Sequence, residues 1–92
     1  MIVYLVCYDV SDDKVRERVA KVLLGYGNRV QYSVFEVSVR SPAELERLCA
    51  QLRAVADESA DIRLYRLCEH CRRIARNLAG ERIVELPAVV IV

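Results

Sequence analysis

The feature that most restricts the fold is an apolar segment close to the N-terminus, Ile2 to Asp9, which reads IVYLVCYD. Its β-branched and aromatic residues are typical of a β-strand. Both alternating faces of this strand are apolar, so neither face is suited to contact with water. We therefore expect a central strand that is covered on both sides, or by helices on one side and a partner on the other.

An amphipathic helix is predicted directly after this strand. Apolar residues recur at helical spacing between Val15 and Tyr26, and the stretch GYGN predicts the end of the helix. We expect Ser11 to cap its start. Asp12 and Asp13 then fall in the first turn, where free N–H groups and the helix dipole favour negative charge.

The rest of the chain continues to alternate between strands and helices. The stretch Arg29 to Val39 is strand-like, but its apolar side chains change face near Ser33, which indicates a bulge or a break. A second helix is predicted to begin at Ser41, in an S-P-x-E capping box. Residues 61–67 are typical of another strand, and CEHCRRIARNLAG predicts a short helix that is closed by Gly80.

This order predicts one α+β domain over residues 1–92, in a ferredoxin-like βαββαβ arrangement with both main helices on one face of a mixed sheet. Residues 1–78 form its core, and residues 79–92 form an extended C-terminal strand segment. Pro87 confines at least one point of that segment to a sheet edge or a bulge. The stretch between the two helices is short for two full strands, so one long kinked strand is an alternative.

Composition restricts the location and the partners of the chain. The net charge of +1 provides no global positive field, so binding of nucleic acid requires a local patch. The N-terminal apolar run is too short to span a bilayer and has neither a basic flank nor a cleavage-site pattern. We expect a cytoplasmic protein with no membrane partner and with thiol cysteines. Because a small domain buries limited surface, a homo-oligomer is also expected.

Asp9 is the carboxylate that the helix start does not explain. It lies at the C-terminal end of the expected central strand, where ligand sites form and where burial of a charge requires a partner. It is either a hydrogen-bonded strand-end residue or a metal ligand or catalytic residue. One carboxylate is a weak ligand set for the Mg²⁺ of phosphodiester hydrolysis, but a symmetric dimer supplies a second copy of Asp9.

Three arginines have two possible roles. Arg16 and Arg18 flank the apolar stripe of the first helix, and Arg29 begins the next strand. Each is either an ordinary arginine at the rim of a helix or strand, or part of a phosphate-binding site next to Asp9.

The CEHC stretch places Cys68 and Cys71 on either side of His70. A C-x-x-C pair is half of a zinc site, whereas Cys7 and Cys49 are spaced as buried strand and helix positions. A full ligand set is therefore absent from one chain, unless a dimer brings two pairs together. We do not expect zinc at Cys68 and Cys71, and redox chemistry is favoured less still because no thioredoxin-like strand context is evident.

Several motifs together resemble one known family over nearly the whole chain. They are the strand ending in Tyr8-Asp9, a D-x-x-R-x-R run and RVQYSVFE, followed by RLYRLCEHC and the apolar end VVIV. This pattern resembles the CRISPR-associated protein Cas2 family, the small nuclease-like subunit of the spacer-acquisition machinery. The resemblance implies a ferredoxin-like homodimer in which the C-terminal strand of each chain joins the partner's sheet.

The resemblance also implies roles for individual residues. Asp9 and its symmetry mate would be catalytic and would hold Mg²⁺ or Mn²⁺ for hydrolysis of RNA or DNA. Ser33 would approach the metal through its hydroxyl or backbone. The remaining matching positions would support nucleic-acid binding: Tyr8, Arg16, Arg18, Arg29 and Phe35. The two aromatic residues among them suit a core or an interface equally well.

Two further functions are consistent with the resemblance. In the family, the small dimer bridges dimers of the CRISPR integrase Cas1 and supports duplex DNA, so the chain could be a scaffold whose retained Asp9 has no catalytic use. A toxin-like ribonuclease related to virulence-associated protein D shares the same fold. The residues do not distinguish RNA from DNA as substrate, and they indicate no base preference.

Overall fold

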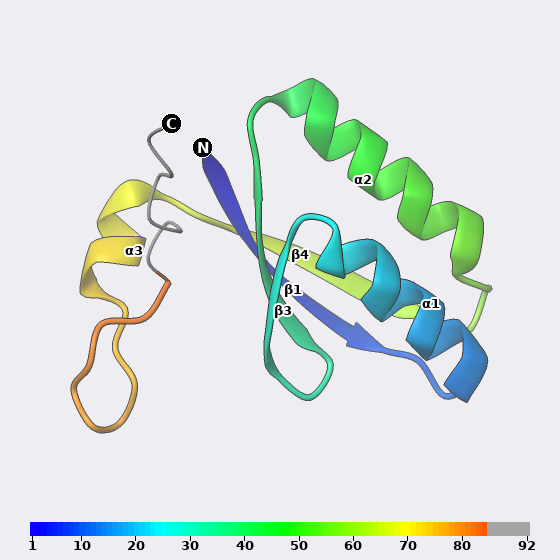
Figure 1. Ribbon diagram of the computed structural model, residues 1–92, viewed down its shortest axis with the longest axis horizontal. Coiled ribbons are helices and arrows are strands. Elements are labelled where there is room, and N and C mark those ends of the chain that lie inside the picture. The colour runs from blue at the N-terminus through cyan, green and yellow to red at the C-terminus, as the bar shows by residue number, and fades with distance from the viewer. Residues whose placement is uncertain (85–92) are drawn as a thin grey trace.

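The computed structural model describes residues 1–84, which form four strands and three helices in the order βαββαβα (Figure 1). The elements are β1 (Ile2–Asp9), α1 (Asp13–Leu24), β2 (Gly27–Gln31), β3 (Val34–Val39), α2 (Pro42–Val55), β4 (Asp61–Leu67) and α3 (Glu69–Ile74). Of the expected C-terminal strand segment, residues 79–92, the part from 85 to 92 lies outside this description, with Pro87 and any exchange of that strand. Residues 79–84 form no strand and belong to a loop that the Arg76–Arg82 bridge closes.

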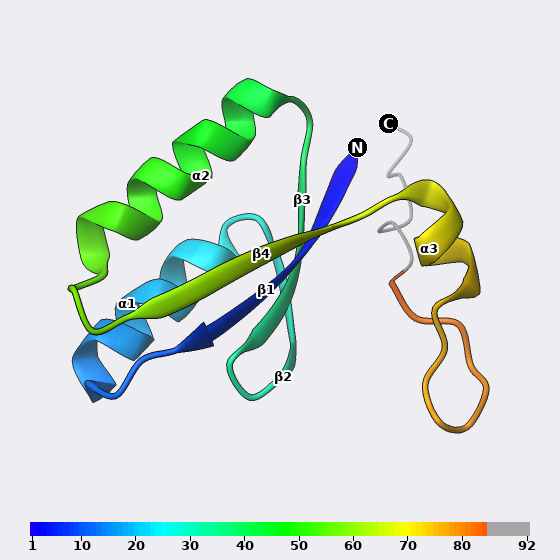
Figure 2. The same cartoon turned by 180° about the vertical axis from the view of Figure 1, so that it is seen from behind.

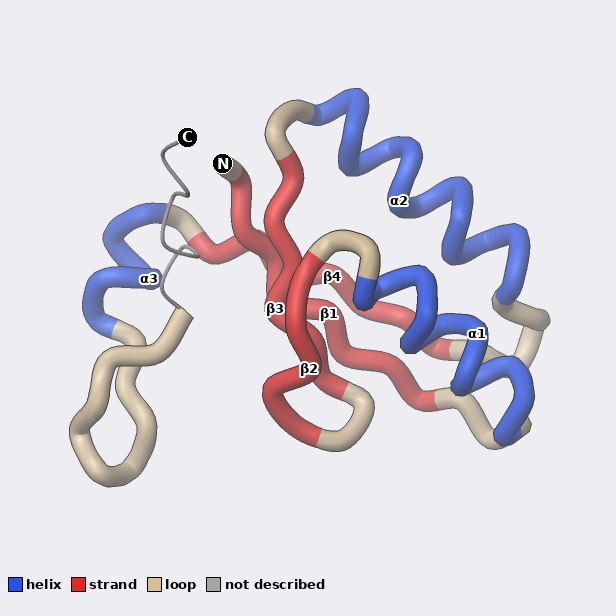
Figure 3. The backbone as a smooth tube through the Cα atoms, in the orientation of Figure 1, coloured by secondary structure: helices blue, strands red, loops and turns tan. Residues whose placement is uncertain are grey.

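The four strands form one sheet in the order β2-β3-β1-β4, and each neighbouring pair is antiparallel. The prediction of a central β1 is therefore confirmed, and the strand order is the ferredoxin-like one. The expected mixed sheet is wrong within residues 1–84, because every pair there is antiparallel. Helices α1 and α2 form a layer on one face of this sheet (Figure 3). Figure 2 shows β1 and β4 from the other face, with neither helix in front of them.

The core lies between the sheet and the two helices. Its largest fully buried side chains come from both layers: Phe35, Leu23, Leu48, Val6, Val19, Val37 and Val39. In β1, Val6 and Tyr8 belong to this core. Because side chains alternate along a strand, Leu5, Cys7 and Asp9 lie on the opposite face, which we call the open face of the sheet. In the described part of the chain, no helix is long and apolar enough to cross a membrane.

The start of α1 differs by one residue from the prediction. Asp12, not Ser11, is the N-cap residue, and its Oδ1 accepts hydrogen bonds from the backbone N–H groups of Lys14 (2.9 Å) and Val15 (3.0 Å). A carboxylate at this position reaches the N–H groups of the second and third helical residues. Asp13 lies in the first turn, as expected.

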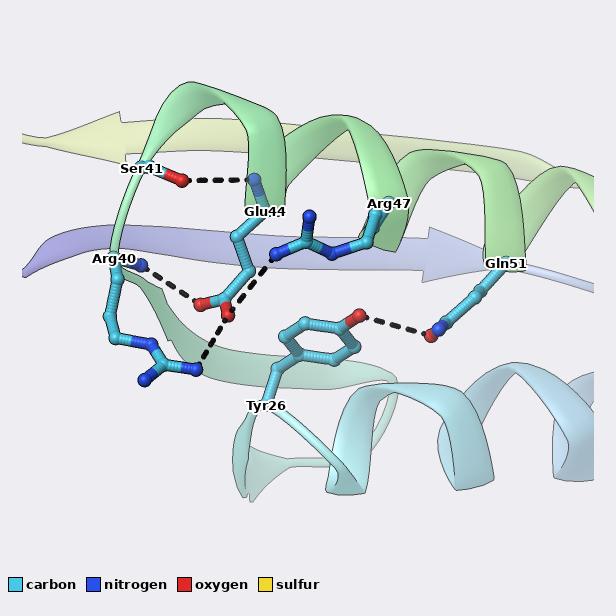
Figure 4. Close-up of polar contacts among 6 residues, drawn as sticks. All are labelled: Tyr26, Arg40, Ser41, Glu44, Arg47 and Gln51. Atoms are coloured by element: carbon cyan, nitrogen blue, oxygen red, sulfur yellow. Dashed lines mark hydrogen bonds and ion pairs between the residues drawn. The ribbon is translucent and has the colours of Figure 1, made fainter.

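Helix α2 begins as predicted. Ser41 Oγ accepts a hydrogen bond from the N–H of Glu44 (3.2 Å), and Pro42 is the first helical residue. The return bond of the capping box goes one residue further back, because Glu44 accepts from the N–H of Arg40 (2.9 Å). Figure 4 shows this group beside the Tyr26 hydroxyl, which donates to Gln51 at 3.1 Å and links the start of the hairpin to α2.

The stretch between α1 and α2 is a hairpin, so the alternative of one long kinked strand is wrong. The chain turns at Tyr32 and Ser33, where the expected break occurs, and Ser33 adopts a left-handed backbone conformation (φ 60°). The register between β2 and β3 also shifts between Arg29 and Gln31, which indicates a β-bulge.

Helix α3 ends earlier than predicted. It stops at Ile74, with Ala75 as its C-cap residue, and none of its residues is buried. Gly80 instead lies in a turn further on, at φ 87°, within a loop whose two sides meet at the Arg76–Arg82 bridge. A positive φ explains the glycine here as well as a helix end would.

Candidate functional site

Two adjacent hollows lie at the end of β1, and Tyr8, Tyr32 and Ser33 line both of them. The acidic hollow, of about 260 Å³, is lined further by Cys7, Asp9, Val34, Asp61 and Arg63. The second hollow, of about 310 Å³, is lined further by Asp13, Arg16, Glu17 and Arg29, and we call it the basic hollow only for its two arginines. The tip of the β2–β3 hairpin, at Tyr32 and Ser33, therefore borders both hollows.

Asp9 lies opposite a second carboxylate in the acidic hollow. It is the last residue of β1, and its register partner across the sheet is Asp61, the first residue of β4. Residues that face each other in an antiparallel pair project to the same side, here the open face of the sheet. The expectation that one chain supplies a single carboxylate is therefore wrong.

The solvation argument for Asp9 also needs correction. Asp9 is exposed in the single chain, because α1 and α2 cover the other face of the sheet. Its side chain consequently needs no compensating partner within the chain. The case for a function of Asp9 depends on its neighbours and not on a buried charge.

Asp61 and Arg63 are two site residues that sequence reasoning missed. Arg63 contacts Asp61 through Nη2 and Oδ2 (3.0 Å), and its Nε lies 3.2 Å from both carboxylate oxygens. The hydrogen bond to Asp61, and to a smaller extent the hydrogen bond to Tyr65, raises the pKa of Arg63 above its ordinary value. A signal for both was available, since a strand antiparallel to β1 must begin beside the end of β1.

Ser33 fixes the hairpin tip against β1. Its carbonyl accepts a hydrogen bond from the Tyr8 N–H (3.0 Å), and this bond continues the sheet one residue beyond the paired strands. The carbonyl is thereby engaged, and Ser33 lines both hollows.

Arg16 is held firmly in the basic hollow. Its Nη1 donates to the Val10 carbonyl (2.7 Å), its Nη2 forms an ion pair with Asp13, and its guanidinium carbon lies 5.9 Å from the centroid of the Tyr32 ring. The hydrogen bond to Asp13 raises the pKa of Arg16. The guanidinium group is therefore oriented before any ligand arrives.

The other two predicted arginines differ in position. Arg29 also lines the basic hollow, with its guanidinium carbon 5.5 Å from the Phe35 ring centroid. Arg18 is exposed on α1 and lines neither hollow. The arginine that shares a hollow with Asp9 is thus Arg63, and none of the three predicted arginines lines that hollow.

The two aromatic residues, Tyr8 and Phe35, belong to the core. Both are buried, and their rings are 6.2 Å apart between centroids at an interplanar angle of 33°. Packing alone explains this pair, which agrees with their interpretation as core aromatics. Tyr8 additionally borders both hollows, so it supports their shape.

The acidic hollow suits a hard divalent cation in its donor chemistry. The carboxylates of Asp9 and Asp61 are the oxygen ligands that Mg²⁺ prefers, and Mg²⁺ usually keeps several waters. No group of three or more His, Cys, Asp or Glu side chains that could hold a metal occurs in residues 1–84. One chain therefore offers an open, incomplete ligand set, to which a symmetric copy would add.

Comparison with known proteins agrees with this architecture. The family model for CRISPR associated protein Cas2 matches residues 1–74. The CRISPR-associated endoribonuclease Cas2 4 of Rhodospirillum rubrum is 41% identical over 91 residues, covering 96% of this chain and 73% of the relative. The CRISPR-associated endoribonuclease Cas2 1 of Chloroflexus aurantiacus is 46% identical over 70 residues, covering 75% of each chain.

Two solved structures extend the comparison. A chain of a partial Cas6-RT-Cas1–Cas2 complex superposes with a TM-score of 0.85 at 34% identity, over 100% of both chains. The crystal structure of Streptococcus pyogenes Cas2 gives a TM-score of 0.73 at 39% identity, over 83% of this chain and 98% of that one. With a matching fold, a matching family model and relatives above 40% identity, the chain belongs to the Cas2 family of CRISPR-associated proteins.

Proposed function

We propose that this chain is a divalent-metal-dependent endonuclease that hydrolyses RNA or DNA phosphodiesters as a homodimer in CRISPR spacer acquisition. The observation that carries the proposal is the cross-strand pair of Asp9 and Asp61 on the open face, with Arg63 lining the same hollow. The relatives named endoribonucleases, at 41% and 46% identity, support the same reaction class.

The chain's own residues would divide the work between the two hollows. Asp9 would hold Mg²⁺ or Mn²⁺, with Asp61 beside it and oriented by Arg63. When bound, such an ion neutralises phosphate charge and activates water. Arg16 and Arg29 would bind the phosphate backbone on the other side of the hairpin tip, since guanidinium groups suit phosphate oxygens. No histidine lines either hollow in the described residues, and we assign no protein general base.

The open face supports the homodimer part of the proposal. In register, Leu5 lies between Tyr65 and Glu36, and Cys7 lies between Arg63 and Val34, so the face carries apolar groups that α1 and α2 do not cover. A second copy on this face would bring a second Asp9 towards the first.

The free edge of the sheet offers a second contact region for that copy. β4 pairs only with β1 among the described strands, and a groove of about 570 Å³ runs between α2 and β4. Ile62 and Leu64 of β4 line this groove, with Leu52 of α2. An edge with no second partner strand in residues 1–84, beside a groove that contains apolar side chains, suits the addition of one extended apolar strand. The apolar sequence LPAVVIV at the end of a second copy is a suitable occupant.

Cleavage of labelled single-stranded RNA and of duplex DNA, with Mg²⁺ and after chelation, tests the nuclease proposal. We expect wild-type protein to cleave one of them with Mg²⁺ only, and Asp9→Asn to lose at least about a hundredfold in rate, the scale of a lost essential catalytic group. Glu46→Gln, which removes a carboxylate from the exposed side of α2, is the matched control and keeps its activity. Equal activity of wild type and Asp9→Asn, or no cleavage by either, would contradict the proposal.

A second candidate function is a scaffold for the CRISPR integrase Cas1, with support for duplex DNA. The whole-chain likeness to a chain from a complex that contains Cas1 favours it, and it does not exclude the first function. Spacer acquisition in cells distinguishes the two. A scaffold role predicts normal acquisition by Asp9→Asn even where that variant has lost cleavage, whereas a catalytic role in acquisition predicts that both are lost.

A further inference from the structure

Two thiols face each other at the junction between β4 and α3. Cys68 and Cys71 share a hydrogen bond of 3.2 Å between their Sγ atoms, and both side chains are exposed. The N–H of Cys71 also donates to the Sγ of Cys68 (3.4 Å), which makes Cys68 the residue that caps α3. Cys7 and Cys49 are half-buried by comparison.

This pair is separate from the candidate nuclease site. Asp61 begins β4 and lies at the acidic hollow, whereas Cys68 follows the last residue of the same strand. The pair therefore stands a full strand length from Asp9. No third His, Cys, Asp or Glu in residues 1–84 completes a metal cluster with the two sulfurs.

We propose that Cys68 and Cys71 form a reversible intramolecular disulfide by exchange with a low-molecular-weight disulfide, such as oxidised glutathione. The geometry makes this the nearest reaction for the pair, since their sulfurs are already in contact. The sequence alone does not favour redox chemistry at this pair, because the spacing of two cysteines does not show that their sulfurs meet.

The exchange proceeds in two steps that balance. The thiolate of Cys68 attacks one sulfur of the small disulfide, forms a mixed disulfide and releases one small thiol, which takes up the proton from Cys68. The thiolate of Cys71 then attacks the Cys68 sulfur, closes the protein disulfide and releases the second small thiol. The protein dithiol loses two electrons, and the small disulfide gains them.

The local hydrogen bonds assign the order of attack. The backbone N–H and then the side chain of Cys71 lower the pKa of the Cys68 thiol, whereas the Cys68 side chain raises the pKa of Cys71. Cys68 is therefore the attacking thiol and Cys71 the resolving thiol.

The disulfide would fix the first turn of α3. This helix has no buried residue, and its first turn is held by backbone bonds such as that from Arg72 to the Cys68 carbonyl (3.0 Å). A covalent bond across the same turn would hinder its opening. The redox state would thus control how tightly the segment after β4 is ordered.

Equilibration of the full-length protein in reduced and oxidised glutathione mixtures, followed by acid quench and peptide mapping without reduction, tests the proposal. We expect a peptide linked from Cys68 to Cys71 that dithiothreitol reverses, together with several-fold slower amide exchange at Arg72 in the oxidised protein. A protein that carries only glutathione adducts, or disulfides to Cys7, Cys49 or a second chain, would overturn it. Unchanged exchange at Arg72 would overturn the ordering of α3.

Single variants separate the two thiols. Cys71→Ser should accumulate one glutathione adduct at Cys68, because the resolving thiol is missing. Cys68→Ser should react several-fold more slowly, and the double variant Cys7→Ser/Cys49→Ser should form the disulfide as wild type does. Thiols that are protected in the purified protein, and released only by a chelator together with zinc, would show a metal site instead and refute the proposal.

Discussion

At the scale of single residues, three aspartates within five positions have three different surroundings. Asp12 accepts two backbone N–H groups at the start of α1, and Asp13 pairs with Arg16. Asp9 has no hydrogen-bond or ion-pair partner for its carboxylate within residues 1–84, and it faces Asp61 across the sheet. Of the three carboxylates, Asp9 is therefore the one that the described residues leave available for a ligand.

The cap of α1 gives a prediction for neighbouring residues. Asp12→Ala should lower the free energy of unfolding by about 1 kcal/mol, because two helix N–H groups lose their acceptor. Ser11→Ala is the matched control and should change stability by less than about 0.5 kcal/mol, as exposed substitutions do. Urea denaturation of both variants provides the measurement. A larger loss for Ser11→Ala would mean that Ser11 is the cap after all.

Glu44 gives a prediction for pH dependence. The N–H of Arg40, and then its guanidinium group, hold the pKa of Glu44 below its ordinary value of 4.5. A carboxylate whose pKa is lower in the folded state stabilises the fold at pH values above its pKa in the unfolded chain. This contribution disappears as the pH falls through the pKa of the folded state. The Tm of Glu44→Gln should therefore lie below that of wild type at pH 7, and the gap should narrow below pH 4.5.

The control for Glu44 is Glu46→Gln, on the exposed side of the same helix. Thermal unfolding followed by circular dichroism between pH 7 and pH 3 compares the variants. The Tm of Glu46→Gln should differ less from that of wild type at pH 7 than the Tm of Glu44→Gln does. A Glu44→Gln gap that stays constant over this pH range would show that the carboxylate charge is not the stabilising feature.

At the scale of elements, the β2–β3 hairpin depends on a close backbone approach at Gly27. A Cβ added there would lie 1.9 Å from the Glu36 carbonyl oxygen and 2.7 Å from the Val37 Cα. Gly27→Ala must push the two strands apart, and we expect a loss of about 1–3 kcal/mol in unfolding free energy. Gly25→Ala, whose Cβ would meet only the Val22 oxygen at 3.3 Å, should change stability by less than about 1 kcal/mol. Similar losses for the two variants would contradict this account.

The elements differ in how far the sequence determines them. β1 and β4 were predicted from their own apolar patterns, and the start of α2 from its Ser-Pro-x-Glu signal, because those signals are local. The hairpin was ambiguous, since its turn contains Ser33 in a left-handed conformation instead of a glycine. The end of α3 was misplaced because Gly80 suits any turn with positive φ.

The candidate site was predicted only in part, because some of its residues have no local signal in the sequence. Asp9 was identified from its place at the end of one strand, whereas Asp61 and Arg63 require knowing which strand lies beside it and in which register. The sequence also suggested that Arg16, Arg18 and Arg29 lie near Asp9, yet none of the three lines the hollow that contains Asp9. Such relations arise from tertiary structure and have no local signal.

At the scale of the whole molecule, the sheet has one covered and one uncovered face. α1 and α2 bury the side that contains Val6 and Phe35, while Leu5 on the open face of β1 stands between Tyr65 and Glu36. Burial raises the pKa of Glu36 even in the single chain, so this face is already partly removed from water. An apolar central strand with one open face is explained if a second chain completes the coverage.

The open face therefore gives a prediction for the oligomeric state. Leu5→Arg would place a charge at the centre of the proposed contact without entering the core, and it should shift the protein from dimer to monomer. Leu24→Arg makes the same substitution at an exposed leucine on α1, on the helix side, and should leave the dimer intact. Light scattering after size exclusion, at matched concentrations, measures both variants, and circular dichroism checks that each is folded. If the folded Leu5→Arg variant remains dimeric, the two copies do not meet through this face, and the pairing of their Asp9 residues across it loses its basis.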